Sequence, residues 1–146
     1  MEINYIDDCS EEQVNNVIRV SRVTIAAFRN GKYLFIKRRN SSTLELPEAE
    51  KDQGEKPRDS VRRFLSEKMG VITSRLEFVT AYSLTEGADI EYGLLYCADI
   101  DEMGPFPHSE FVSVYYLDTP PEDKDKWSFP ETQKPLLDKA VESRKQ

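Results

Sequence analysis

A tight turn between two apolar segments is the feature that most restricts how this sequence can fold. The dipeptide Asn30-Gly31 separates Val23–Phe28 from Tyr33–Lys37, and both segments are rich in β-branched, aromatic and other apolar residues. Asn-Gly supplies the positive φ angles that a two-residue hairpin turn requires. The sequence therefore predicts an antiparallel strand pair over these two segments.

An amphipathic helix is expected further along the chain. Pro57 pre-sets the φ angle of a first helical turn, and Gly70 ends the apolar pattern. The apolar positions between them are spaced by 3, 4 and 8 residues, which places them on one helical face. They are Val61, Phe64, Leu65 and Met69.

The remaining elements complete a layered fold. Strands are predicted at Leu76–Ser83, Glu91–Ile100 and Phe111–Leu117, and a helix from Thr132, as its N-cap, to Ser143. The segment from Asn40 to Lys56 is polar and turn-prone, with a short strand suggested only by the alternation of Leu44 and Leu46. We expect one α/β (α+β) domain with a mixed β-sheet, spanning residues 1–146.

Composition excludes several classes of protein. The 146 residues are 38% hydrophobic, enough for one domain with a core, and the net charge of −7 disfavours a general nucleic-acid binder. A small anionic ligand needs a bound cation or a local basic cluster. No apolar segment approaches the length of a membrane span, and Met1–Tyr5 lacks the features of a secretory leader, so we expect a cytoplasmic protein without a membrane partner. Cys9 and Cys97 are predicted to be reduced thiols.

The candidate chemistry lies in an acidic loop and the helix that follows it. The loop carries four carboxylates, and the outer face of the helix offers Arg63, Glu67 and Lys68. Several oxygens near a helical carboxylate suit a hard divalent cation such as magnesium. The alternative is a solvated acidic turn. The loop carboxylates are Glu48, Glu50, Asp52 and Glu55.

This segment resembles the Nudix box, G-x5-E-x7-R-E-U-x-E-E-x-G-U, in which U is aliphatic. The resemblance covers nearly the whole chain and implies an α/β/α sandwich in which a loop–helix–loop binds Mg²⁺ or Mn²⁺. The family hydrolyses nucleoside diphosphates linked to another group, and the later segments are similar to a bacterial branch described as 8-oxo-dGTP diphosphatases. The matching positions are Glu55, Arg63, Leu65, Glu67, Gly70 and Val71.

Three positions depart from the box. Ala49 replaces its glycine, and Phe64 and Lys68 replace two helical glutamates, which makes the family's metal site more positive by about three charges relative to the family pattern. With about 100° of rotation per residue, positions 64, 67 and 68 project within one arc, so Phe64 and Lys68 are expected to face the metal position. We therefore expect weak or absent metal binding there. In the alternatives, Phe64 widens the apolar helix face and Lys68 holds a phosphate directly.

The resemblance also assigns roles to residues of the metal site. Glu67 and Glu110 are the expected catalytic groups, with Glu110 as a further metal ligand or general base. Glu55, Glu67 and Asp52 are the expected metal ligands, and a displaced cation site built from Glu48, Glu50 and Asp52 is an alternative. An ion pair between Glu55 and Arg63 is expected to brace the loop against the helix.

Substrate contacts are implied at Arg38, Gln133 and Lys68. Arg38 closes the second strand, where a guanidinium suits phosphate oxygens, although a basic strand end is often simply solvated. The amide of Gln133 is placed to recognise a nucleobase, or else faces water in the first turn of the last helix.

Two classes of function follow. In the first, the chain descends from a Nudix hydrolase and is impaired or inactive by the metal route. In the second, it is a non-catalytic nucleotide-binding or regulatory module, or an interaction domain that keeps only the scaffold. A small-molecule nucleotide is the expected partner, in a monomer or a homodimer.

Overall fold

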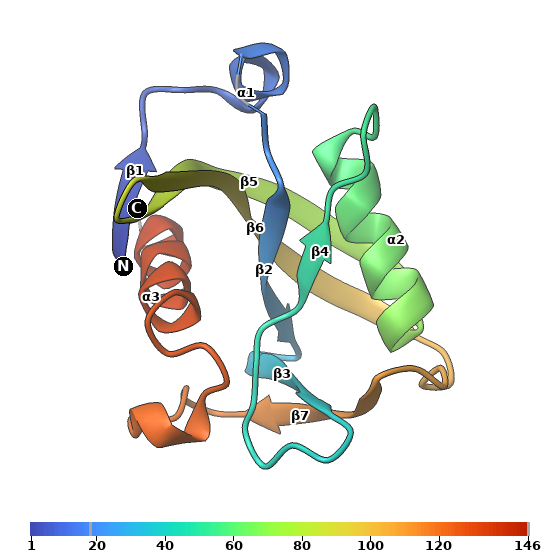
Figure 1. Ribbon diagram of the computed structural model, residues 1–146. Helices are drawn as coiled ribbons and strands as arrows, with labels where there is room; N and C mark the ends of the chain where they lie inside the picture. Colours follow the sequence, from blue (N-terminus) through green and yellow to red (C-terminus); the bar gives the residue numbers. More distant parts are fainter. Residues whose placement is uncertain (18, 146) are drawn as a thin grey trace.

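The computed structural model describes residues 1–17 and 19–145, so residues 18 and 146 of the predicted 1–146 domain lie outside the described residues. Figure 1 shows the arrangement of the elements along the chain. They are β1 (Glu2–Ile6), α1 (Glu11–Val17), β2 (Arg22–Arg29), β3 (Lys32–Arg38), β4 (Glu48–Glu50), α2 (Pro57–Met69), β5 (Val71–Glu86), β6 (Asp89–Met103), β7 (Phe111–Leu117), the 3₁₀ helix η1 (Lys124–Lys126) and α3 (Gln133–Arg144).

The strands of the described residues form one mixed sheet. Its order is β1-β5-β6-β2-β3-β7, and β4 also pairs with β2. Strand β2 runs parallel to β6, whereas the other paired strands are antiparallel. The predicted mixed sheet is confirmed.

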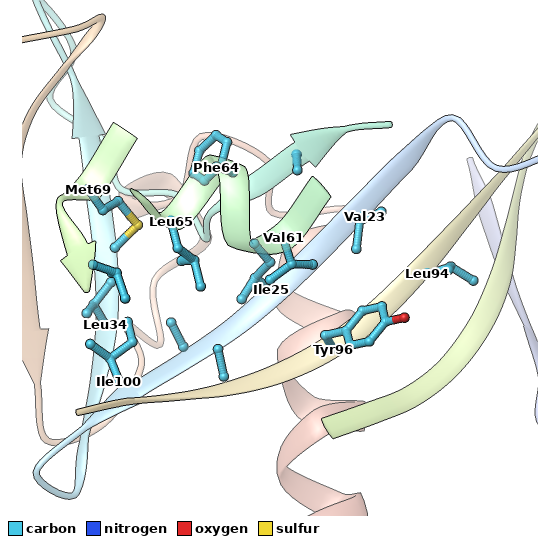
Figure 2. Close-up of a cluster of buried hydrophobic side chains, with 14 of the residues drawn as sticks. Val23, Ile25, Leu34, Val61, Phe64, Leu65, Met69, Leu94, Tyr96 and Ile100 are labelled. Carbon is cyan, nitrogen blue, oxygen red and sulfur yellow. The ribbon is translucent and has the colours of Figure 1, made fainter. Parts of the chain in front are cut away.

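Helices cover both faces of this sheet, as Figure 1 shows. Because side chains alternate along a strand, Val23 and Ile25 of β2 join the cluster under α2, whereas Ala26 joins the cluster under α3. Figure 2 shows the α2 cluster, to which the helix contributes its predicted apolar positions. The layered α/β/α arrangement expected from the resemblance is present.

The two strongest local signals are confirmed. The Asn30-Gly31 turn joins β2 to β3, with φ angles of 52° and 77° at its two residues. Helix α2 begins at Pro57, and Gly70 caps its C-terminus in the left-handed conformation, with φ of 74°.

Other elements differ from the sequence predictions. Strands β5 and β6 extend well beyond the predicted segments, as one long hairpin. Thr132 does not cap α3 with its side chain, because its backbone is already helical rather than extended. Leu44 and Leu46 lie outside the strands, and Leu44 makes only an isolated bridge to Trp127. Within the described ranges, no helix is both long and apolar enough to span a bilayer.

An ion pair fixes the loop after β4 to helix α2. The Arg63 guanidinium donates to both carboxylate oxygens of Glu55, with each N–O distance at 3.0 Å, and also to the Glu50 carbonyl. The Ser60 hydroxyl donates to Glu55 at 2.6 Å, and the Asp52 amide donates to it at 3.3 Å. These contacts tie residues 50–55 to the first two turns of the helix.

This brace makes stability depend on pH. The hydrogen bonds from Arg63 and Ser60 lower the pKa of Glu55 to about 2. A carboxyl with a lowered folded-state pKa stabilises the protein above its unfolded pKa, and this contribution is lost as the pH falls through the folded value. We predict that Glu55→Gln lowers the free energy of unfolding by about 1–3 kcal/mol at neutral pH. Thermal unfolding at several pH values should show the difference from wild type shrinking below about pH 4.5 and vanishing near pH 2.

The exposed Glu67 of the same helix provides the control. Glu67→Gln removes the same formal charge but none of the hydrogen bonds of the brace, so it should leave the unfolding temperature near the wild-type value. An equal loss of stability in both variants would contradict a specific role for the ion pair.

Candidate functional site

The main candidate site is an open cleft beside the loop after β4. It encloses about 870 Å³ between this loop, the start of β2, the end of β3 and the segment before α3. Its walls combine basic, acidic and aromatic side chains, among them Arg22, Arg38, Glu48, Lys51, Glu91 and Phe129.

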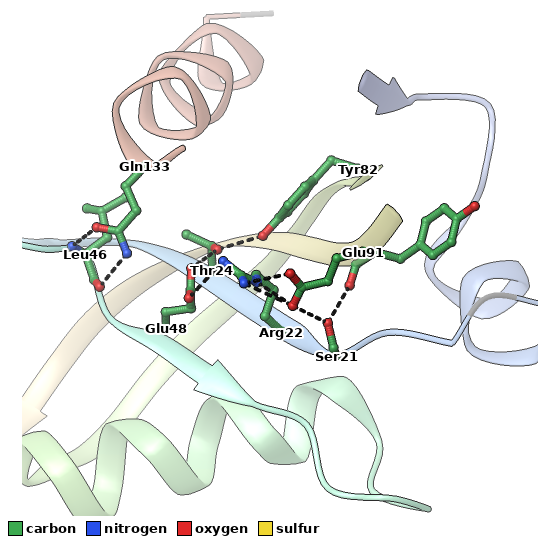
Figure 3. A network of polar contacts seen from close by, with 9 residues as sticks. Ser21, Arg22, Thr24, Leu46, Glu48, Tyr82, Glu91 and Gln133 are labelled. Carbon is green, nitrogen blue, oxygen red and sulfur yellow. Dashed lines mark hydrogen bonds and ion pairs between the residues drawn. The ribbon is translucent and has the colours of Figure 1, made fainter. Parts of the chain in front are cut away.

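A hydrogen-bonded network, drawn in Figure 3, joins cleft-lining side chains such as Arg22 and Glu48 to buried residues behind them. The hydroxyl groups of the buried Tyr82 and Thr24 lie 2.9 Å apart, and Thr24 donates to Glu48 at 2.8 Å. Arg22 lies between two carboxylates, at 3.6 Å from Glu48 and 2.8 Å from Glu91. Burial raises the pKa of Tyr82, so this hydroxyl stays protonated as a hydrogen-bond donor. The network holds Glu48 in one orientation, beside the Arg22 guanidinium.

Arg38, for which a substrate contact is predicted, lies at the edge of this cleft. Its guanidinium stacks on the Phe111 ring at 4.9 Å, and its Nε donates to Glu45 at 3.0 Å. Glu45 is only 3% exposed, and burial raises its pKa although the hydrogen bond from Arg38 opposes the rise. Because its side chain is half-exposed, Arg38 presents positive charge to the cleft while its Nε remains bound to the buried Glu45.

The Phe64 ring is buried in the core beneath α2. It is 8% exposed and packs edge-on against Phe111, with the ring centroids 5.8 Å apart. The expectation that Phe64 points toward the metal position is therefore wrong, and the alternative of a wider apolar helix face is correct. Position 64 lies beside the apolar stripe of α2, so an aromatic ring there turns into the core.

Lys68 and Glu110 form an ion pair with each other. The Lys68 Nζ lies 2.8 Å from Glu110 Oε1, which joins α2 to the segment before β7. The hydrogen bond from Lys68 lowers the pKa of Glu110. Lys68 stands where the resemblance leads us to expect a box glutamate. Its ammonium group pairs with Glu110, the residue that was expected to serve as a metal ligand or base.

The carboxylates expected to bind a metal do not gather. Glu67 is exposed on α2, Glu55 is engaged by Arg63, and Asp52 lies at the cleft, 3.7 Å from Arg63. Among residues 1–17 and 19–145, no group of three His, Cys, Asp or Glu side chains is arranged to hold an ion. Lys68 stands among these positions, and Glu55, Asp52 and Glu110 already lie beside an arginine or a lysine side chain. The residues therefore do not fit the Mg²⁺ or Mn²⁺ site of the box.

Gln133 serves a different purpose from either expectation. It is 1% exposed, and its Oε1 accepts from the Leu46 amide at 2.8 Å while its Nε2 donates to the Leu46 carbonyl at 3.3 Å. The side chain neither faces water nor offers its amide to a nucleobase. Its amide instead bonds to both the N–H and the C=O of Leu46, as the backbone of a neighbouring strand would. It thereby joins α3 to the chain that leads into β4, as Figure 3 shows.

Phe129 is a cleft residue that the sequence analysis did not select. Its ring is 46% exposed although it is a large apolar group, and it lines the cleft together with Arg38 and the loop after β4. Phe129 lies in one of the later segments that are similar to the bacterial branch, but an aromatic residue beside Pro130 in a turn-prone segment is too common to indicate a site by itself.

Comparison with known proteins gives structural but not sequence relationships. No family model matches the sequence, and no curated protein matches it. The structure is similar to the Bacillus subtilis pyrophosphohydrolase BsRppH, with a TM-score of 0.78 and 18% identity over 97% of this chain and 90% of that one. The Nudix domain of Shewanella oneidensis NrtR, solved with ADP ribose, gives a TM-score of 0.66 and 18% identity over 93% and 99% of the two chains.

A third similar structure is a Nudix hydrolase from Nitrosomonas europaea, with a TM-score of 0.66 and 15% identity over 86% of this chain and 90% of that one. These similarities extend over most of each chain at low sequence identity. The chain has the fold of the Nudix hydrolases.

Proposed function

We propose that this chain binds a nucleotide or a related nucleoside diphosphate compound in the cleft, and that its hydrolysis by the metal route of the Nudix box is impaired or absent. The observation that carries the proposal is the ion pair between Lys68 and Glu110. It places a cation and its counterion where the box calls for a group of metal-binding carboxylates.

Electrostatics support the loss of the metal route. Two unit charges 4 Å apart interact by about 4 kcal/mol at an effective dielectric constant of 20, and a divalent ion doubles this energy. Lys68 would repel such an ion, while Phe64 contributes no oxygen ligand because it packs against Phe111. Glu67 alone does not offset that repulsion, since magnesium binding by protein normally relies on more than one anionic oxygen.

The cleft supports the binding part of the proposal. Arg38 offers a guanidinium at its edge, and the exposed ring of Phe129 offers a flat apolar surface on the same cleft. Charged phosphate oxygens suit the first group, and a planar heterocycle suits the second. ADP ribose contains both chemical features, and a Nudix domain of similar fold has been solved with it.

Residual hydrolysis of nucleotides such as 8-oxo-dGTP is the second candidate. It is favoured by one observation, the exposure of Glu67 beside the intact Glu55–Arg63 brace. In this alternative, the Lys68–Glu110 pair at the surface opens to admit a cation.

The first test replaces the lysine. We predict that Lys68→Glu creates a cation site together with Glu67 and the released Glu110, so that Mn²⁺ binds at least tenfold more tightly than to the wild type. Isothermal titration calorimetry with Mn²⁺ measures this affinity, and Lys68→Gln is the matched control because it removes the ion pair without adding a ligand. Phe64 is left unchanged, since a carboxylate at this buried position would destabilise the core.

Hydrolysis assays separate the two candidates. The wild type should release no product from ADP ribose, 8-oxo-dGTP or other nucleoside diphosphate derivatives with Mg²⁺ or Mn²⁺ present. Turnover of any of them by the wild type that is abolished in Glu67→Gln would overturn the claim of impairment and establish the second candidate.

The binding proposal is tested without metal. With EDTA present, ADP ribose at about 5 mM should raise the unfolding temperature, because a ligand of the native state stabilises it by mass action. Phe129→Ala should weaken this binding at least fivefold while preserving the fold, since the ring is exposed. Arg38→Gln should also weaken it, but this variant leaves Glu45 buried without its cation, so its folding is checked separately by circular dichroism.

Arg39→Gln is the matched control for charge. Arg39 follows Arg38 directly and donates to the carbonyl of Ser109, away from the cleft lining. Binding that is lost equally in both arginine variants, or that survives Phe129→Ala unchanged, would contradict the placement of the ligand in this cleft.

A further inference from the structure

A second cavity lies at the opposite end of β2 from the cleft. It encloses about 550 Å³ between the β2–β3 turn, strands β5 and β6, and the end of α3. Arg22 at the start of β2 lines the cleft and Arg29 at its end lines this cavity, so about 23 Å of extended strand separates the two places. Ligands in the two cavities would not touch.

The charged side chains of this cavity are unequally matched. Its lining contains three arginines but only two aspartates. Arg144 is held by Asp99 through two hydrogen bonds of 2.7 and 3.1 Å and stacks on Phe28 at 4.3 Å. Arg75 pairs with Asp101 at 3.3 Å.

Arg29 is the arginine without an acidic partner. Among the described residues its only hydrogen bond runs from Nη1 to the hydroxyl of Tyr116, at 3.2 Å, and no carboxylate lies within ion-pair distance. Its Nε is buried and has no hydrogen-bond acceptor, and it is the only buried side-chain nitrogen or oxygen of the described residues in this condition. A buried donor of a charged group is costly to leave unpaired, because it has lost water without gaining a partner.

Arg75 lines the same cavity and can bind a ligand together with Arg29. The Arg75 side chain is 73% exposed, and its contact with Asp101 is long for a charged hydrogen bond. Exposed ion pairs of this kind contribute little to stability. Arg75 can therefore turn toward a ligand at small cost, whereas Arg144 remains fixed to Asp99 and Phe28.

We propose that this cavity binds a small oxyanion of the phosphate class, held mainly by Arg29 and assisted by Arg75. Such an anion compensates the one positive charge in excess, and a small turn of the Arg29 side chain toward it gives the buried Nε the acceptor that the protein does not supply. The planar guanidinium fork matches the geometry of two phosphate oxygens. Phosphate, as the free ion or as the terminal group of a monoester, has the required charge and size.

The test is a titration with inorganic phosphate, monitored by amide NMR and calorimetry at constant ionic strength in chloride. We expect phosphate to shift the amide signal of Gly31, in the turn beside the cavity, and to leave that of Gly54, in the cleft, unchanged. Arg29→Gln should weaken phosphate binding at least tenfold, and Arg75→Gln severalfold. Arg62→Gln, at an exposed position of α2, removes the same charge and should have no effect.

The second arm identifies the source of the phosphate. Tighter binding of glycerol phosphate than of inorganic phosphate, with the same shift at Gly31, assigns the site to a monoester, and the reverse order assigns it to the free ion. Absence of binding at about 20 mM phosphate, shifts confined to Gly54, or equal affinities of the wild type and Arg29→Gln would overturn the proposal. Arg75→Gln alters only an exposed side chain and should fold. Where Arg29→Gln does not fold, an unchanged phosphate affinity in Arg75→Gln would overturn the proposal.

Discussion

The ion pair between Glu55 and Arg63 is the contact on which the shape of the cleft depends. It fastens the loop after β4 to helix α2, and that loop forms a wall of the cleft. Without it, residues 50–55 would have few other contacts with the body of the protein, because most of their side chains are exposed. The contact also leaves Glu55 fully committed to Arg63 and Ser60, so that the same carboxylate is a poor candidate for any other partner.

Helix α2, in the segment that resembles the Nudix box, shows that the shape of a loop–helix–loop and metal chemistry have separate requirements. The brace, the apolar face and the Gly70 cap are all present, and together they suffice to form the loop–helix–loop. At the two helix positions where the resemblance leads us to expect glutamates, Phe64 and Lys68 make contacts that stabilise the fold. Phe64 adds apolar contact with Phe111, and Lys68 joins the helix to Glu110.

The parts of the fold that the sequence predicted are those specified by neighbouring residues. The Asn30-Gly31 turn and helix α2 each carry their own signals within a few positions. Strand β1 and helix α1 were not predicted, because their formation depends on distant partners. Strand β1 pairs with β5 some eighty residues later, and Glu11 of α1 is held by Arg58 and by the hydroxyl of Tyr96.

In the candidate site too, contacts between residues close in sequence were predictable and contacts between distant residues were not. The Glu55–Arg63 pair spans eight residues and could be inferred from spacing and resemblance, whereas the contact of Gln133 with Leu46 joins residues 87 positions apart. A buried glutamine and one that faces a ligand have the same sequence signature in the first turn of a helix. Only the packing of α3 against the sheet distinguishes them.

Pairing, rather than composition, determines the electrostatic character of the cleft. The net charge of −7 suggests repulsion of anions, yet three of the carboxylates that line the cleft are engaged by arginines: Glu48 and Glu91 by Arg22, and Glu45 by Arg38. An anion that reaches Arg38 must share this guanidinium with Glu45, which is buried beneath it and whose pKa is raised by that burial. Affinity from Arg38 alone is therefore limited, because the gain of a phosphate contact is offset by weakening a buried ion pair. A ligand that also covers the exposed ring of Phe129 gains apolar contact without that cost, which favours a molecule with both an anionic and a planar part over a simple anion.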